Sequence, residues 1–136
     1  MQSATVLIDS FIKKITESEL LNDSCCAIRA YESKNLPVPI RMTYFSFSAA
    51  ENRLYYSYSA DGTKKEINSI KISVNCFIPL DLSPAVIYTL TETVMDILMK
   101  SNTEIVGFTV GKIEYDTDVD AFRLNSEINY QTEKQV

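Results

Sequence analysis

The sequence centres on Ser69-Ile70-Lys71-Ile72-Ser73-Val74-Asn75-Cys76-Phe77-Ile78, in which apolar residues alternate with mainly polar ones. Successive side chains of a β-strand point to opposite faces of a sheet. The apolar positions 70, 72, 74, 76 and 78 therefore predict a long strand with one buried face. Pro79 is expected to end this strand, because proline has no N–H group to donate to a neighbouring strand.

The residues just before this strand predict two more strands. Residues 40–48 begin by alternating and change phase at Tyr44-Phe45, which indicates either a bulge or burial on both faces. After a short break, residues 53–59 alternate again, with Leu and Tyr on one face and mostly polar residues on the other. Asp61-Gly62 then predicts a tight turn into the central strand.

The N-terminal third predicts a helix, a turn and a strand. Residues 4–20 carry apolar side chains at helical spacing, and Asn22-Asp23-Ser24 has the composition of a turn that ends the helix. Cys26–Tyr31 is a strand candidate. Lys34–Pro39 contains two prolines, so it predicts an extended connection rather than a central strand.

A second helix is predicted after the central strand. Ser83 is expected to cap its first turn, with Pro84 at the first helical position, where the missing N–H costs nothing. Lys100 is favourably placed near the negative end of the helix dipole. The predicted core-facing stripe consists of Ile87, Leu90, Val94, Ile97 and Leu98.

The last third predicts a closing hairpin. Residues 105–115 form one or two strands around Gly107 and Gly111, and Asp116–Asp120 makes an acidic turn. Residues 122–131 alternate again, and the polar tail at residues 132–136 is expected to be loose. Residues 1–136 are expected to form one domain of the α+β class, a mainly antiparallel twisted sheet with two helices packed on one face.

The composition argues against several classes of function. The chain has 13 Lys and Arg against 18 Asp and Glu, a net charge of −5, so we expect neither general nor sequence-specific binding of nucleic acid. It contains no histidine, which excludes Ser-His-Asp and Cys-His catalysis in their usual forms. We expect no enzyme activity. No apolar run reaches the length of a membrane span, and we expect no signal peptide.

The three cysteines are Cys25, Cys26 and Cys76. Adjacent residues on a strand point to opposite faces, so Cys25 and Cys26 are not expected to share one site. The sequence therefore predicts three reduced thiols in a cytoplasmic protein, at least one of them in the core.

The acidic residues near the C-terminus resemble a calcium-binding loop. Asp116, Asp118, Asp120 and Glu127 occupy the first, third, fifth and twelfth places of an EF-hand loop. However, Ala121 stands where that loop needs glycine, and the flanking residues alternate like strands. We therefore expect an acidic turn at a hairpin tip with no metal or other cofactor. A weak ion site is the alternative.

Tyrosines are abundant in the first half of the chain. Tyr44, Tyr55, Tyr56 and Tyr58 are expected in or near neighbouring strands, so some of them must face outward. Ordinary packing with hydroxyl groups reaching water is one interpretation. The other is an interface, because tyrosine provides a large rigid contact area with a polar tip.

The order of elements resembles a known family. A leading helix, central antiparallel strands, a second helix beginning at Ser83-Pro84 and a hairpin with an acidic tip follow one another. The closing stretch is Gly111-Lys-Ile-Glu-Tyr-Asp-Thr-Asp-Val-Asp-Ala-Phe-Arg-Leu-Asn-Ser-Glu-Ile-Asn-Tyr130. In these features and in length, nearly the whole chain resembles the tail-terminator proteins of long-tailed bacteriophages and phage-tail-like particles.

The resemblance implies a structural role without catalytic residues. Such a protein forms a ring, expected to be a hexamer, that caps the tail tube, stops its polymerisation and joins the tail to the head or collar. The implied partners are copies of itself and the tail tube protein, and also the sheath protein and the head-tail connector. The implied location is a virion or phage-tail-like particle assembled in the cytoplasm of a bacterial host.

The expected contact surface is borne by the sheet, with the acidic turn near a rim. Its candidate residues are Tyr55, Tyr56, Arg123, Asp116, Asp118 and Asp120. Three alternatives remain open. The chain could be another phage neck, tail-completion or tube protein. It could be a small ligand-binding or enzyme domain with a pocket between sheet and helices. It could also be an adaptor that binds peptides at a sheet edge.

Overall fold

Five strands form one sheet in the computed structural model, which describes residues 3–21 and 24–136. The sheet order is β1-β2-β3-β5-β4. β1 runs parallel to β2, and the other neighbouring strands are antiparallel. The elements in chain order are α1 (Ala4–Glu17), β1 (Cys25–Arg29), the 3₁₀ helix η1 (Ala30–Asn35), β2 (Thr43–Tyr58), β3 (Lys64–Pro79), α2 (Val86–Ser101), β4 (Ile105–Asp116) and β5 (Ala121–Gln135). The predicted α+β class and mainly antiparallel sheet are confirmed.

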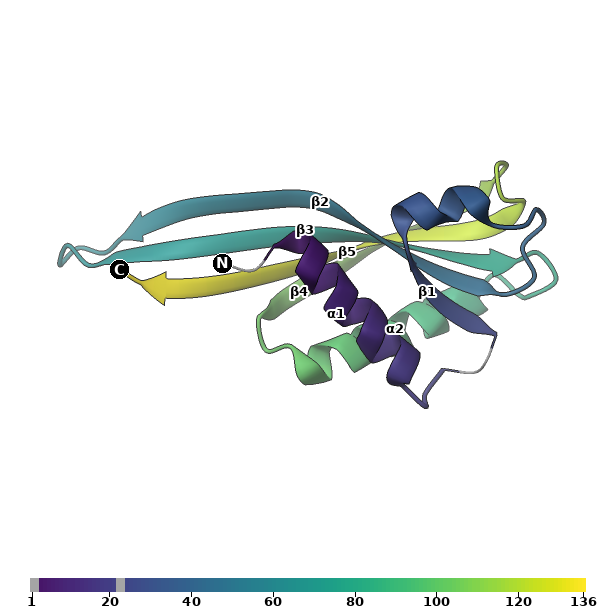
Figure 1. Ribbon diagram of the computed structural model, residues 1–136, viewed down its shortest axis with the longest axis horizontal. Coiled ribbons are helices and arrows are strands. Elements are labelled where there is room, and N and C mark those ends of the chain that lie inside the picture. Colours follow the sequence, from purple (N-terminus) through teal and green to yellow (C-terminus); the bar gives the residue numbers. More distant parts are fainter. Residues whose placement is uncertain (1–2, 22–23) are drawn as a thin grey trace.

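The central strand β3 carries the core, as its alternation predicts. Its apolar positions 70, 72, 74, 76 and 78 are buried under α1 and α2, which lie on the same side of the sheet (Figure 1). Each such buried aliphatic side chain contributes roughly 1.5–3 kcal/mol through removal of apolar surface from water. The strand is longer than predicted, since it begins at Lys64.

The helix ends differ from the predicted ones. α1 starts where the Ser3 hydroxyl accepts a hydrogen bond from the Val6 N–H at 3.2 Å, and it ends at Glu17 rather than at residue 20. Residues 22 and 23 of the turn predicted after it lie outside the described residues. α2 begins at Val86 rather than at Pro84, and Ala85 rather than Ser83 occupies the cap position. The reason is a tight preceding turn, in which the Val86 N–H donates to the Ser83 carbonyl at 3.0 Å.

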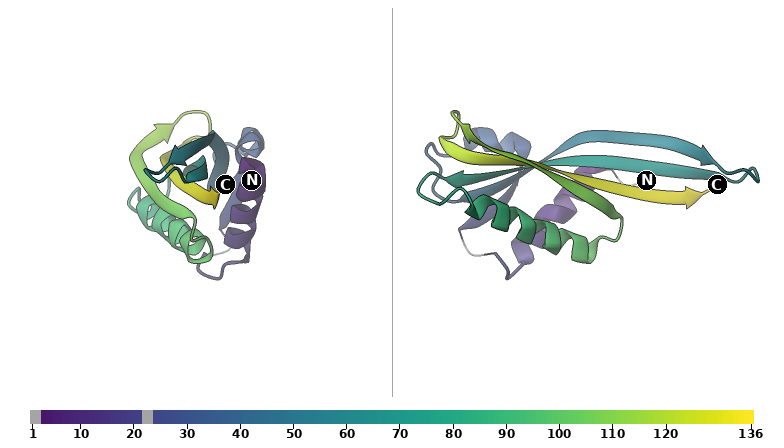
Figure 2. Two further views of the ribbon diagram at one scale, coloured as in Figure 1. Left: turned by 90° about the vertical axis from the view of Figure 1, so that its left-hand side faces the viewer. Right: turned by 180° about the vertical axis from the view of Figure 1, so that it is seen from behind.

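The buried stripe of α2 has as many residues as the predicted one but is shifted around the helix. Ile87, Val94 and Leu98 are buried as expected, but Thr91 and Met95 are buried as well. Leu90 and Ile97, both predicted in the core, are only half-buried. The helix lies obliquely across the sheet beside α1, so the strip of its surface that meets the core is not centred on the most apolar residues (Figure 2).

β2 is buried on both faces near its start. The helices cover one face at Phe45 and Phe47, and a second cluster of Ile40, Phe77, Val119 and Ala121 lies on the other face, beside Tyr44. Burial on both faces thus explains the phase change at Tyr44-Phe45. The bulge lies farther along, between Ala49 and Glu51, and the strand continues through the break predicted there.

A three-stranded arm extends past the helices (Figure 1). We define the arm as residues 51–58 of β2, 64–69 of β3 and 131–135 of β5. The C-terminal tail predicted to be loose is part of it, so that prediction is wrong. Gln135 lies opposite Lys65, and the Val136 N–H donates to the Lys64 carbonyl at 3.2 Å. The predicted extended segment at residues 34–39 is also partly wrong, because η1 reaches Asn35.

Candidate assembly surface

The predicted contact residues lie at two distant places on the sheet. Tyr55 and Tyr56 are in the arm, where Tyr56 lies opposite Glu66 of β3. Arg123 lies opposite Phe77, near the other end of the same strand. Eleven positions along a strand correspond to roughly 36 Å. Arg123, which the sequence interpretation grouped with the tyrosines, therefore lies far from them along the sheet, as does the acidic turn.

The bulge in β2 decides which side chains share a face of the arm. Before the bulge, the odd-numbered residues of β2, such as Phe45 and Phe47, point to the helices. The extra residue between Ala49 and Glu51 reverses the phase. Beyond it, even-numbered residues continue the core-facing side, so Tyr56 and Tyr58 extend the face that Phe47 begins.

This continuation of the core face is exposed and apolar. Leu54, Tyr56 and Tyr58 are 45%, 47% and 67% exposed, because the sheet here has passed beyond the helices that bury Phe47 (Figure 2). The register places three charged residues on the same side. We call this set the inner arm face, and its members are Leu54, Tyr56, Tyr58, Lys64, Glu66 and Lys134.

A cation lies directly on this aromatic surface. The Lys64 ammonium is 4.2 Å from the centroid of the Tyr56 ring. At an exposed site such a cation–π contact contributes about 0.5–1 kcal/mol. The contact keeps a positive charge beside the Tyr56 ring.

On the opposite face of the arm, the charged and aromatic side chains contact one another. The Arg53 guanidinium lies 5.4 Å from the Tyr55 ring, and Lys65 forms an ion pair with Glu133 at 3.7 Å. Ile67 lies opposite Tyr55 and is buried despite its position in the arm. Tyr55 thus contacts Arg53 on its own face. The inner arm face, with Tyr56 and Tyr58, presents more exposed aromatic surface than the opposite face with Tyr55.

The predicted acidic turn is present, and its polar groups contact one another. The Asp116 carboxylate accepts hydrogen bonds from the Asp118 N–H at 2.9 Å and from the Arg123 guanidinium at 3.2 Å. Arg123 also donates to Glu114 at 2.7 Å. Among residues 3–21 and 24–136, no cluster of three or more His, Cys, Asp or Glu side chains could hold a metal ion.

Asp120 completes this turn with an unusual backbone conformation. Its φ is 51°, in the left-handed region, which aspartate tolerates better than most residues. Its carboxylate accepts a hydrogen bond from the Tyr115 hydroxyl, and this bond raises the pKa of Tyr115. The turn is therefore a folded hairpin tip with an acidic surface.

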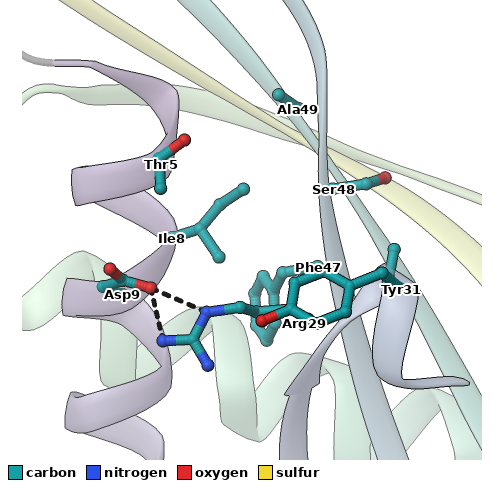
Figure 3. Close-up of a pocket in the computed structure, with 9 residues that line it drawn as sticks. Thr5, Ile8, Asp9, Arg29, Tyr31, Phe47, Ser48 and Ala49 are labelled. Atoms are coloured by element: carbon teal, nitrogen blue, oxygen red, sulfur yellow. Dashed lines mark hydrogen bonds and ion pairs between the residues drawn. The ribbon is translucent and has the colours of Figure 1, made fainter.

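Outside the arm, in the part of the molecule that carries the helices and that we call the body, a hollow of about 210 Å³ lies between α1 and the sheet (Figure 3). Its charged groups point toward one another. The Asp9 carboxylate accepts hydrogen bonds from the Arg29 guanidinium at 2.6 and 2.9 Å, and Arg29 also reaches Glu32 at 3.3 Å. The hydrogen bonds to Asp9 foremost, and then the one to Glu32, raise the pKa of Arg29. The arrangement joins α1 to the start of η1.

The cysteines are placed as the sequence predicts. Cys76 is buried in the core, and burial raises the pKa of its thiol to about 12. Cys25 packs against the main core, while Cys26 points to the other face of β1, beside Tyr44. None of these three described cysteines forms a disulfide.

A larger hollow, of about 410 Å³, lies between α2 and β4. We call it the α2–β4 groove, and its lining residues are Tyr88, Thr91, Glu92, Phe108, Val110 and Gly111. Tyr88 and Val110 are 45% and 43% exposed, so the groove is open to contact from outside. The sequence pattern does not predict this groove, and its local signal is limited to an aromatic residue, Tyr88, one helical turn before Glu92.

No family model matches the chain, and no curated protein matches it. Of the helices within residues 3–21 and 24–136, none combines the length and apolar character needed to cross a membrane.

Proposed function

We propose that this protein is a structural subunit that works by assembling with copies of itself, as a tail-terminator ring on a tail tube. The observation that carries the proposal is the inner arm face. A sheet surface that is buried under helices in the body continues into the arm with Leu54, Tyr56 and Tyr58 exposed. Covering such a surface with another subunit is favourable, because it removes apolar side chains from water.

The rest of the molecule is consistent with binding rather than catalysis. The chain contains no histidine, and the charged groups in the hollow beside α1 are bonded to one another. The residues of the acidic turn are paired in the same way. In the proposed role, one side of the ring matches the end of the tube, and the other side does not recruit another tube subunit. Contacts within the ring are head-to-tail around a closed rotation.

Electron microscopy of the purified protein tests this proposal. The protein is imaged by negative stain, alone and mixed with tail tubes, and its mass is followed by sedimentation velocity. The expected result is a closed ring, or a ring that forms only on tube ends. Open tubes of this protein alone would indicate a tube protein instead. A monomer that stays solitary beside tubes, or a sample that turns over a small molecule, would contradict the proposal.

A further inference from the structure

The inner arm face combines exposed aromatic rings with cations. Tyr56 and Tyr58 are its most exposed large hydrophobic side chains, and Lys64 lies against the Tyr56 ring. Lys134 is on the same face, opposite Glu66. Two cations against one anion give this face a net positive charge. A partner surface should therefore be apolar with an acidic border.

The α2–β4 groove has this chemistry. Phe108 and Val110 of β4 and Tyr88 of α2 give it an apolar lining. Glu92 lies at its edge, and Asp96 follows one helical turn later on the exposed side of α2. The rim of the groove on α2 is thus acidic, complementary to the lysines of the inner arm face.

The two surfaces cannot meet within one chain. Val110 of β4 pairs with Ser126 of β5, which in turn pairs with Val74 of β3. Tyr56 of the arm pairs with Glu66 of the same strand β3. Eight positions of extended strand separate these points, roughly 26 Å. The arm also extends away from the body that carries the groove (Figure 2). A contact between them therefore requires two molecules.

We propose that the inner arm face of one copy docks into the α2–β4 groove of the next copy, with Tyr56 and Tyr58 against the apolar lining and Lys64 beside Glu92. The inference rests on the proposed function, self-assembly, and names the surfaces that perform it. Because arm and groove are different surfaces, each copy offers one of each to its two neighbours. Repetition of such a contact generates a ring where the rotation closes.

Four variants test the contact by sedimentation velocity over a concentration series. Tyr56→Ser with Tyr58→Ser removes the aromatic surface, and Lys64→Glu and Glu92→Lys each reverse one charge. The fourth variant, Lys64→Glu with Glu92→Lys, restores opposite charges. The matched control is Arg53→Glu on the opposite face of the arm. The substituted side chains are exposed except that of Lys64, which is half-buried, and circular dichroism verifies that each variant is folded.

We expect the tyrosine variant and each single charge reversal to weaken self-association by about tenfold or more. The double charge reversal should recover most of the loss from either single reversal, and Arg53→Glu should associate like the unsubstituted protein. Recovery in the double variant is the sharpest result, because damage to folding would not be repaired by a second substitution on another element.

The outcomes separate the two proposals. If the unsubstituted protein forms no assembly, alone or with tail tubes, the proposed function fails. If it assembles and the arm variants assemble equally well, the docking inference is overturned while the proposed function stands. Assembly that needs Tyr56 and Tyr58 but is indifferent to Glu92→Lys would overturn the groove as the docking site.

Discussion

A β-carbon at Gly111 of β4 would lie 2.9 Å from the backbone carbonyl oxygen of Asn125 in β5. The close approach arises at the bulge between Val110 and Ile113, which brings the two backbones together. Backbone cannot give way as a flexible side chain would. We predict that Gly111→Ala lowers the free energy of unfolding by about 1–3 kcal/mol, measured by urea denaturation.

Gly107 is the matched control, because it lies in the same strand at the other bulge. A β-carbon there meets no atom within 4 Å. Gly107→Ala should therefore change the free energy of unfolding by no more than about 0.5 kcal/mol. Equal losses for the two variants would show that the contact with Asn125 is unimportant.

The C-terminal tail is predicted to hold the arm together. Deletion of residues 131–136 removes one of the two neighbours of β3 between Lys65 and Ser69. The amide groups at residues 64–69 should then exchange faster with solvent, while those at residues 72–78, which stay paired in the body, should change little. Hydrogen exchange followed by mass spectrometry measures both.

Side-chain effects of that deletion can be separated from backbone effects. Glu133→Ala with Lys134→Ala removes the ion pair to Lys65 and the charge beside Glu66, but it keeps the paired backbone. Protection at residues 64–69 should survive in this variant. Unchanged exchange after deletion of the tail would mean that the pairing of β5 with the arm is not stable in solution.

The tail also shows where sequence patterns fail. Strand β3 between residues 70 and 78 is predicted correctly, because its alternation reflects burial under helices that the chain itself supplies. Residues 132–135 are polar and mostly exposed, and they form a strand only because Lys65 and its neighbours offer open hydrogen-bonding groups. Such pairing depends on residues distant in sequence, and no local pattern encodes it.

The candidate surface was predictable only in part. Alternation groups Tyr56 with Tyr58, but the face they share depends on the bulge at residues 49–51, which is placed by pairing with β3. The spacing of residues also does not show where along the sheet a residue lies. Tyr55 and Arg123 were therefore assigned to one surface, although they pair with β3 near its opposite ends. The groove joins Tyr88 of α2 to Val110 of β4, which only tertiary packing brings together.

The cysteines are expected to react in an order set by burial. Burial raises the pKa of Cys76 to about 12, so at pH 8 its thiol is protonated as well as inaccessible. Iodoacetamide should label Cys25 and Cys26, which are half-buried, before Cys76. Peptide mass spectrometry measures the order. In denaturing urea all three should react, and labelling of native Cys76 as fast as Cys26 would contradict its place in the core.

The turn at the tip of the arm should make stability depend on pH. The Asp61 carboxylate accepts a hydrogen bond from the Ser59 hydroxyl and another from the Thr63 N–H at 3.0 Å, and these bonds lower its pKa to about 2. In the unfolded chain the pKa of aspartate is about 3.9. The folded state therefore binds the proton less tightly. The stabilisation is fully present above about pH 4 and is lost as the pH falls toward 2.

Asp61→Ala should accordingly lower the melting temperature at pH 7, and its difference from the unsubstituted protein should shrink between about pH 4 and 2. Asp61→Asn keeps an oxygen that can accept both hydrogen bonds but carries no charge. Its melting temperature should lie between those of the other two proteins at pH 7, because hydrogen bonds to a charged acceptor are stronger. Thermal unfolding followed by circular dichroism measures all three. A difference for Asp61→Ala that persists undiminished at pH 2 would show that the turn depends on the shape of the side chain and not on its charge.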